Sequence, residues 1–469
     1  MVGRAAERRL LEDLVASREA ELAVVYGRRR VGKTFLVRRV LGERLLFSYT
    51  GAANVTAAVQ LARVEQALRA HGWNGPAPLT TWFDAFDALR ALIERSDPAQ
   101  PAIVFLDELP WMDNRRSGFL PAFEHFWNGW GSGVARLKLV ICGSAASWLT
   151  KKVFQNRGGL HNRVTRPIHL APFTLGECKA YADARGLALN LHDLVESQMV
   201  FGGIPYYLRL LDPRRSLALN VDALCFGDNA PLAGEFDQVF SSLFARPERH
   251  RDVVALLSKS HQGVTRQDLA RGLGFADGGT LTQVLDDLGQ SGFVRHYQPY
   301  GKAKNGGLWQ ITDPFVAFHL RFMTRARTPD FWSASTDSAA RRAWSGYAFE
   351  RVCLNHVPQL RRALGIGGVV ADVSSWRARP DGDSPGAQVD LVIDRNDQVV
   401  NLCEMKYSAG DYAVDAATER TLRNKAEAFR RATKTRKALH LTLVTTYGLK
   451  PGLHAGVFQS TVTAADLLA

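Results

Sequence analysis

The chain has 469 residues, of which 46% are apolar and 22% are charged, a composition typical of globular proteins and not of disordered ones. This length exceeds what one hydrophobic core supports, so we expect two to four domains. The formal net charge of +13 favours polyanionic partners such as nucleic acid, although a generally basic surface would give the same balance.

The five cysteines are scattered and form no C-x-x-C pair, which argues against a zinc site and a disulfide framework and fits a reducing cytosol. The sequence has no run of 18 apolar residues and begins with a charged segment. We therefore expect a cytoplasmic protein without a membrane partner.

Residues 5–18 have the spacing of an amphipathic helix, and residues 22–26 that of a buried strand. The next eight residues match G-x-x-x-x-G-K-[ST], the phosphate-binding P-loop, and a helical pattern follows. Lys33 is expected to reach the β- and γ-phosphates, and the Thr34 hydroxyl to bind Mg²⁺. The sequence therefore predicts binding of ATP or GTP. The expected nucleotide-binding residues here are Gly27, Arg28, Arg29, Arg30, Val31, Gly32, Lys33, Thr34 and Phe35.

A second apolar strand, residues 101–106, ends in Asp107 and Glu108. Parallel buried strands deliver such carboxylates to the edge of the sheet where ligands bind. Asp107 is expected in the Mg²⁺ shell, and Glu108 is expected to polarise the attacking water.

A third buried strand, residues 137–144, ends in Ser144, which we expect near the γ-phosphate or the attacking water. An ordinary serine at a tight turn is the alternative. Arg163 is a candidate for stabilising transition-state charge, from its own chain or from a neighbouring subunit. A solvated arginine remains the other interpretation.

Together these motifs resemble the archaeal and bacterial ATPase family among the AAA+ and STAND-like NTPases, over most of the first 325 residues. The resemblance implies an α/β nucleotide-binding core, a helical lid and then a winged helix. The chain departs from the family pattern at Asn162, where glycine is common before the arginine. The segments that carry the resemblance are 27–34, 106–111, 142–147, 170–173 and 201–208.

Residues 236–326 follow a helix–helix–helix–hairpin order with a basic, glycine-rich hairpin tip, which predicts a winged helix-turn-helix. In a DNA complex, Gln283 would lie in the major groove, and Lys302 and Lys304 would contact phosphates. Because the third helix carries Asp286 and Asp287, a lid or protein-contact role is equally open.

Residues 327–340 are rich in Ser, Thr and Ala and are expected to be a linker. In the last domain, 341–469, Asp390 begins the apolar part of one strand, and Glu404 and Lys406 end the next, 14 residues later. Residues i and i+2 of a strand share a face, so Glu404 and Lys406 point the same way. Carboxylate oxygens suit Mg²⁺, and Glu350 on the preceding helix is placed to complete such a site.

This arrangement resembles the PD-(D/E)XK nuclease superfamily, which implies a Mg²⁺-dependent phosphodiesterase. Asp390 and Glu404 would hold the metal, and Lys406 would position or deprotonate the water and stabilise developing charge. The proline that gives the motif its name is absent. An exposed strand-face ion pair, or a nuclease fold that only binds nucleic acid, are the alternatives.

The fold class predicted is α/β: a P-loop NTPase sheet with a helical lid in 1–235, a winged helix in 236–326, and a restriction-endonuclease-like domain in 341–469. We expect an ATPase whose nucleotide state controls a nuclease domain that acts on DNA, with RNA as the second choice. A nucleotide-switched, DNA-binding regulator with a silent nuclease fold is the main alternative. A homo-oligomeric AAA+-like motor is another.

Overall fold

The computed structural model describes residues 1–114, 116–144, 146–154, 159–160, 162–274, 278–301, 306–325, 327–378 and 386–469, with the backbone alone for Ala146. The chain divides into two compact units, with the boundary in the sequence between Pro172 and Phe173. Each unit is described by itself below.

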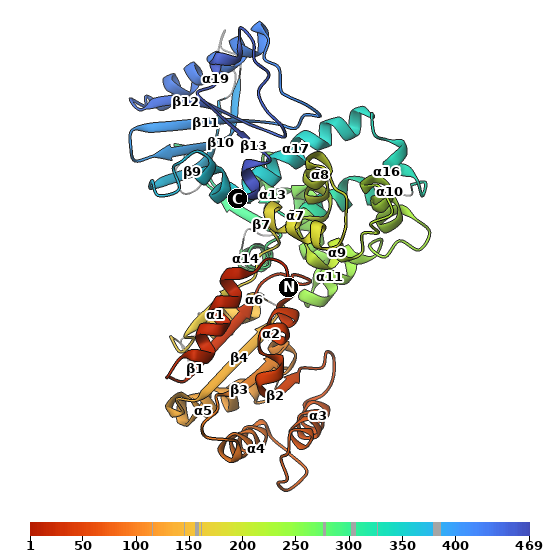
Figure 1. Ribbon diagram of the computed structural model, residues 1–469, viewed down its shortest axis with the longest axis vertical. Helices are drawn as coiled ribbons and strands as arrows, with labels where there is room; N and C mark the ends of the chain where they lie inside the picture. The colour runs from red at the N-terminus through yellow and green to blue at the C-terminus, as the bar shows by residue number, and fades with distance from the viewer. Residues whose placement is uncertain are drawn as a thin grey trace. The chain divides into compact units, whose positions relative to one another are not determined.

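The first unit is built on a five-stranded parallel sheet with the strand order β2-β3-β4-β1-β5 (Figure 1). The inner strands β1, β3 and β4 are almost continuously apolar, as strands covered on both faces must be. The strands are β1 Glu21–Tyr26, β2 Leu45–Thr50, β3 Ala102–Asp107, β4 Leu137–Gly143 and β5 Arg166–His169. The helices are α1 Ala5–Ala16, α2 Lys33–Leu41, α3 Ala57–Ala70, α4 Trp82–Arg95, α5 Phe119–Gly129 and α6 Ala146–Leu149.

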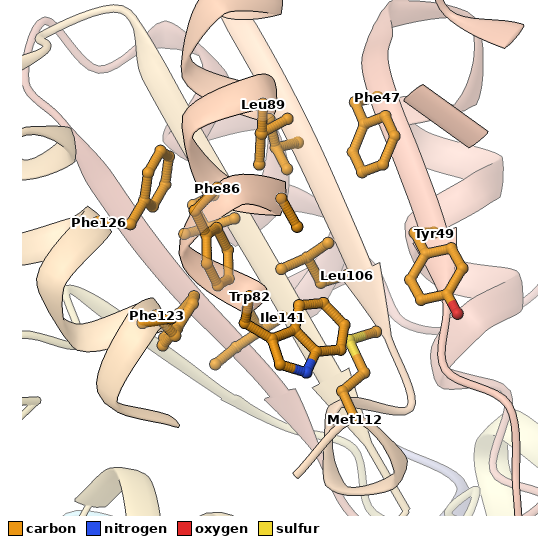
Figure 2. Close-up of a cluster of buried hydrophobic side chains, with 14 of the residues drawn as sticks. Phe47, Tyr49, Trp82, Phe86, Leu89, Leu106, Met112, Phe123, Phe126 and Ile141 are labelled. Atoms are coloured by element: carbon orange, nitrogen blue, oxygen red, sulfur yellow. The ribbon is translucent and has the colours of Figure 1, made fainter. Parts of the chain in front are cut away.

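Aromatic side chains from α4 and α5 fill one face of this sheet (Figure 2). Phe86 stacks on Phe126 with ring centroids 5.1 Å apart, and Trp82 meets Phe119 edge to face at 4.8 Å. The helix α4 starts at a capping box in which Thr81 and Asp84 satisfy each other's backbone N–H groups. Every residue of β1 except Tyr26 is buried, so close packing fixes the position of the strand that leads into the P-loop.

The second unit begins with five helices: α7 Leu175–Ala184, α8 Leu191–Phe201, α9 Pro205–Arg209, α10 Leu217–Val221 and α11 Glu235–Leu243. A three-stranded antiparallel sheet of order β6-β8-β7 follows, with three helices around it. This middle segment contains α12 Pro247–Leu257, β6 Val264–Thr265, α13 Arg266–Leu273, α14 Gly279–Gln290, β7 Val294–Tyr297 and β8 Leu308–Ile311. Lys302 and Lys304 lie outside the described residues. The polar face of α14 leaves Gln283 and Asp286 exposed, whereas Asp287 is buried beside His250.

The C-terminal sheet has the order β13-β12-β11-β10-β9, with β9, β10 and β11 antiparallel and β11, β12 and β13 parallel. The helix α19 packs on it through Leu422 and Phe429, and α17 contacts β11. The elements are α15 Pro314–Phe318, α16 Phe331–Ala334, α17 Ala339–Asn355, α18 Val357–Ala363, β9 Ala371–Ala378, β10 Ala387–Arg395, β11 Val399–Lys406, α19 Ala416–Thr433, β12 Ala438–Thr445 and β13 Ser460–Thr463.

Residues 327–340 differ from the linker that the composition predicts. Trp332 in α16 is fully buried, and its indole N–H donates to Glu196 of α8 at 2.9 Å. The backbone N–H of Trp332 donates to Asp222 at 2.6 Å. Arg341 lies over the Trp332 ring, 4.0 Å from its centroid, and pairs with Glu196 at 2.6 Å. One buried aromatic residue thus makes this segment part of the second unit's core, a feature that a count of Ser, Thr and Ala does not register.

The helical residues 173–235, which we grouped with the ATPase core, lie in the second unit with the middle and C-terminal segments. All five cysteines are reduced and buried. Among the described residues, no helix has the length and apolar character needed to cross a bilayer.

Candidate functional site: a P-loop and a carboxylate–lysine cluster

The loop between β1 and α2 has the backbone conformation that the P-loop motif requires. Gly27 has φ 142° and Gly32 has φ 90°, and a Cβ on Gly27 would lie 2.2 Å from the Leu170 carbonyl oxygen. Glycine at position 27 is therefore a steric necessity. Arg30 also adopts a positive φ of 71°, and left-handed residues of this kind occur in the backbone loops that bind anions.

Lys33 is buried with its ammonium inside this loop. The Nζ donates to the carbonyls of Gly27 and Arg28 at 3.0 and 2.9 Å. Burial lowers the pKa of Lys33 below its usual value, which means that the ammonium lacks full charge compensation. A nucleotide phosphate placed there would supply the missing negative charge.

Three strand ends place the predicted catalytic groups together. The Thr34 hydroxyl donates to Asp107 Oδ2 at 2.8 Å, and the Glu108 N–H donates to Asp107 Oδ1 at 3.0 Å. Since the Thr34 proton points to Asp107, the lone pairs of its oxygen remain available to a cation. The donor set of a hydroxyl and a carboxylate fits Mg²⁺.

Glu108 is held by the third strand end. Ser144 donates to it twice, from the hydroxyl to Oε1 at 2.7 Å and from the backbone N–H to Oε2 at 3.2 Å. Glu108 has a left-handed backbone with φ 49°, a strained conformation of the kind that clusters at functional sites. Ser144, Glu108 and Asp107 thus lie together at the ends of β3 and β4.

Other predicted residues lie elsewhere. Phe35 is at the start of α2 and is 61% exposed. Arg163 is exposed and lies just before β5, where Thr165 N–H donates to the Leu22 carbonyl at 2.9 Å. The P-loop is at the other end of β1, roughly 17 Å away along five extended residues. The structure therefore excludes Arg163 as an arginine finger for the P-loop of its own chain.

The sequence motifs missed Arg4. Its guanidinium donates to the Ala171 carbonyl at 2.7 Å and to the Val31 carbonyl at 3.4 Å, so it ties the P-loop to the end of β5. A single arginine near the N-terminus carries no pattern by which it could have been recognised.

The second cluster contains Glu350 of α17, Asp390 of β10, and Glu404 and Lys406 of β11. The antiparallel register pairs Leu391 with Cys403, which sets Asp390 beside Glu404. A β-bulge in β10 interrupts its pairing with β9 between Val389 and Val392. Bulges of this kind re-aim side chains beside active sites, and here the bulge directs the region of Asp390.

Negative charge is crowded in this cluster. Burial, and then the charges of Asp390 and Glu404, raise the pKa of Glu350 to about 8. Burial, and to a smaller degree Glu404, also raises the pKa of Asp390. A cation would relieve this repulsion, so the residues fit a hard metal ion.

Lysines already engage part of the cluster. Lys406 and Lys425 each lie 2.8 Å from a different oxygen of Glu404. Although burial alone would raise the pKa of Glu404, the two lysines lower it. Glu404 raises the pKa of Lys406 against the effect of burial. Lys406 is therefore an ammonium, suited to stabilising negative charge and not to removing a proton from water.

Gln388 and Gln262 link this cluster to the middle segment. Gln388 Nε2 donates to Asp390 Oδ1, and Gln262 of the middle segment donates to Gln388 Oε1. Glu350, Asp390 and Gln388 line a cavity of about 290 Å³ together with Tyr297 and Gln310 of the hairpin strands β7 and β8. The residues that make these contacts follow no helical or strand periodicity, so the sequence analysis did not predict the contacts.

Among the described residues, one group of three His or acidic side chains has ligand atoms within 4.8 Å of one another: His192, Asp193 and Glu196. The ligand atoms of Glu350, Asp390 and Glu404 are not all within 4.8 Å of one another. Glu196 is already paired with Arg341, which argues against a metal at the first group.

No family model matches the chain. An uncharacterized protein of Methanocaldococcus jannaschii is 22% identical over 434 residues, which cover 87% of each chain. The Walker-type ATPase of Pyrococcus abyssi is similar in structure, with a TM-score of 0.50 and 19% identity over 69% of this chain and 96% of that one. The ORC2 protein of Aeropyrum pernix has a TM-score of 0.39 and 16% identity, over 75% of this chain and 93% of its own. The first of these structures supports the P-loop NTPase fold, as predicted.

Proposed function

We propose that the protein binds ATP with Mg²⁺ and hydrolyses it at the P-loop. The observation that carries this proposal is the set of hydrogen bonds that joins Thr34 to Asp107 and Glu108 to Ser144 at the ends of three parallel strands. The similar Pyrococcus abyssi structure is itself described as a Walker-type ATPase. A bound Mg²⁺ would neutralise phosphate charge and hold the nucleotide in register.

Each residue has a defined task in this proposal. The loop N–H groups and the Lys33 ammonium bind the β- and γ-phosphates, and Thr34 and Asp107 hold the metal. Glu108 orients the attacking water and accepts its proton. Ser144 holds the Glu108 carboxylate in one orientation, so that little orientational entropy is lost during the reaction.

A lysine exchange tests the ATPase. Lys33→Met keeps an apolar stem in the buried site but removes the ammonium, so we expect at least 100-fold weaker ATP binding and no measurable turnover. Lys152→Met, at an exposed lysine of the same unit, is the matched control and should leave both quantities unchanged. ATP hydrolysis that survives in Lys33→Met would refute this assignment.

We further propose that the C-terminal cluster cleaves phosphodiester bonds in nucleic acid, DNA more readily than RNA, under the control of the nucleotide state. The crowded carboxylates beside a cavity and the protonated Lys406 support this. Asp390, Glu404 and Glu350 would hold Mg²⁺, and Lys406 would stabilise the charge that develops on the phosphate. Each Glu404 oxygen accepts from one lysine and keeps a lone pair that could bind the metal.

The test is cleavage of labelled single- and double-stranded DNA and RNA with Mg²⁺ or Mn²⁺, with ATP, with ADP and without nucleotide. Asp390→Asn should abolish cleavage. Asp397→Asn, the same change at an exposed aspartate that pairs with Arg395, should not. Lys33→Met should remove any effect of ATP on the cleavage rate. Equal cleavage by wild type and Asp390→Asn would show a contaminating nuclease and refute the proposal.

One observation favours a second function. With both Glu404 oxygens bound to lysines, the cluster resembles a structural ion-pair network, as a regulator with a silent nuclease fold would have. In that case the ATPase acts as a slow switch, and the middle segment docks on DNA as a winged helix. Retained DNA binding and ATP hydrolysis without cleavage of any substrate would support this alternative.

The position of Arg163 also bears on assembly. Because it is remote from its own P-loop, a catalytic role for it requires a second copy of the chain, as in a homo-oligomeric motor. Size measurement by light scattering with and without ATP, on wild type and Arg163→Ala, tests this. A monomer under both conditions would leave Arg163 without a catalytic role.

A further inference from the structure

A basic cavity of about 890 Å³ lies in the second unit, among α12, α17 and the turn of π-helix η7, His319–Met323. We call it the basic cavity. Among the described residues, its lining includes no Asp or Glu. The cationic residues that line it are Lys259, Arg321, Arg325, Arg327 and Arg351.

Among the described residues, three of the five cations have no carboxylate partner, whereas Asp313 and Glu350 lie near enough to Arg351 to act on its charge. Lys259, Arg321 and Arg325 are exposed and form no ion pair with any described carboxylate. The positive charge also affects His261, which lines the cavity. Burial is the main cause that lowers the pKa of His261, and the charges of Arg351 and Arg321 lower it further. A cavity with one sign of charge concentrates ligands of the opposite sign.

Aromatic surface accompanies the charge. Tyr347 of α17 is 41% exposed and stacks on His261 with ring centroids 3.6 Å apart and planes 5° apart. Trp344, one turn earlier, also lines the cavity; it is 6% exposed, and its Nε1–H has no acceptor among the described residues. Cations beside an exposed aromatic ring are the combination that binds single-stranded nucleic acid.

The basic cavity adjoins the cavity beside the carboxylate cluster, which we call the carboxylate cavity. Both are lined by His261, Gln310 and Tyr347, and the second contains Glu350 and Asp390. A small anion would fill only the basic part, whereas a polymer that enters there reaches the carboxylates. The occupant that this geometry favours is therefore a chain of phosphates.

We propose that the basic cavity binds a single strand of nucleic acid and leads it to the Glu350 and Asp390 cluster, with Arg321 and Arg325 on phosphates and Tyr347 against a base. The choice of ligand rests on the proposed function. The binding site is nevertheless separate from the residues that would cleave, so the two can fail independently.

The experiment measures binding of a fluorescent 20-nucleotide single-stranded DNA to the full chain in EDTA, which prevents metal-dependent cleavage. Arg321→Glu with Arg325→Glu reverses two charges at exposed positions. We expect at least about 10-fold weaker binding and a salt dependence, as log Kd against log salt, smaller by about 1.4 for the two lost phosphate contacts. Arg185→Glu with Arg246→Glu, two exposed arginines outside the cavity, is the matched control and should change neither quantity by as much.

A second variant separates stacking from charge. Tyr347→Ala should weaken binding about 5-fold or more with the salt slope unchanged, because base stacking releases no counterions. The proposal is overturned if the wild type binds no single strand, if both charge-reversed variants lose affinity equally, or if a dinucleotide competes as well as the 20-mer. Cavity-dependent binding without cleavage under any metal condition would sustain the proposal and refute the nuclease function.

Discussion

The Ser144 hydroxyl donates to Glu108 Oε1 at 2.7 Å across the ends of β4 and β3. This bond fixes the orientation of the carboxylate that we assign to the attacking water. It joins two residues 36 positions apart, each of which the sequence identifies only as a polar residue at the end of an apolar run.

Loss of this bond should affect turnover and not binding. In Ser144→Ala, Glu108 keeps the backbone N–H bond but loses the hydroxyl, so we expect kcat for ATP to fall about 10- to 100-fold with the dissociation constant of ATP nearly unchanged. Steady-state kinetics and titration with a fluorescent ATP analogue measure the two separately. Ser132→Ala, at an exposed position of the same unit, should match the wild type. An equal loss of binding would indicate that Ser144 shapes the loop instead.

The P-loop should tolerate no side chain at position 27. Gly27→Ala drives a methyl group against the Leu170 carbonyl at 2.2 Å and requires a positive φ, so we expect a destabilisation of roughly 2–4 kcal/mol and loss of ATP binding. Gly42→Ala is the control, because no atom lies within 4 Å of the added carbon there. Thermal unfolding followed by circular dichroism distinguishes the two. Similar behaviour of both variants would contradict the close approach.

A metal ion should bind to the carboxylate cluster without nucleic acid. The Lys33→Met variant is used because its P-loop should hold no nucleotide. We expect calorimetric titration of this variant with Mn²⁺ to detect one metal-binding site, in the C-terminal segment. Asp390→Asn should weaken that site about 10-fold or more, since a charged oxygen ligand is lost. Asp397→Asn should not. Unchanged Mn²⁺ binding in Asp390→Asn would remove the metal from the mechanism.

Stability should fall in mild acid because of His319. Burial lowers the pKa of His319 to about 4, and its ring stacks on Phe236 with centroids 4.5 Å apart. Below about pH 6.5, the unfolded chain takes up a proton that the folded chain does not. The stability that neutral His319 contributes is thus fully present above pH 6.5 and is lost as the pH falls toward 4.

Urea denaturation at pH 7.5 and pH 5.0 measures this effect. From pH 7.5 to pH 5.0, the free energy of unfolding of the wild type should fall by about 2 kcal/mol more than that of His319→Phe. Phenylalanine preserves the ring stack but does not titrate. His296→Phe, at an exposed position of β7, should retain the wild-type dependence. An identical pH dependence for His319→Phe would show that His319 does not carry it.

The sequence predicted best what local pattern encodes. The P-loop, the strand ends at Asp107 and Ser144, and the order of strands around Asp390 and Glu404 each follow from short contiguous motifs. Arg4, the bulge beside Asp390 and the contact between Gln262 and Gln388 depend on residues that are distant in sequence and polar, and neither helical nor strand periodicity marks such contacts. The salt bridge between Lys425 and Glu404 depends on how α19 packs on the sheet, which no local sequence pattern specifies.

Arg163 is a candidate finger for its own P-loop or for that of a neighbouring subunit, and the position of β5 argues against the first of these. The β5 strand is only four residues long, Arg166–His169, and was not recognised among the prolines and histidines around it. In a parallel sheet, a residue just before a strand lies at the edge opposite to the ligand. Recognition of β5 would have been enough to exclude that assignment.

Trp332 has a consequence for how chains of this kind can be recombined. A domain that is joined by a loose tether can be exchanged between relatives by cutting the tether. Here residues 327–341 contain the buried Trp332 and also Arg341, which pairs with Glu196. Removal of one partner of such a buried pair costs about 3–5 kcal/mol. A chimera that takes its last domain from a relative must therefore carry residues 173–340 with it or match their anchor. In such chimeras, the second unit is best exchanged as a whole.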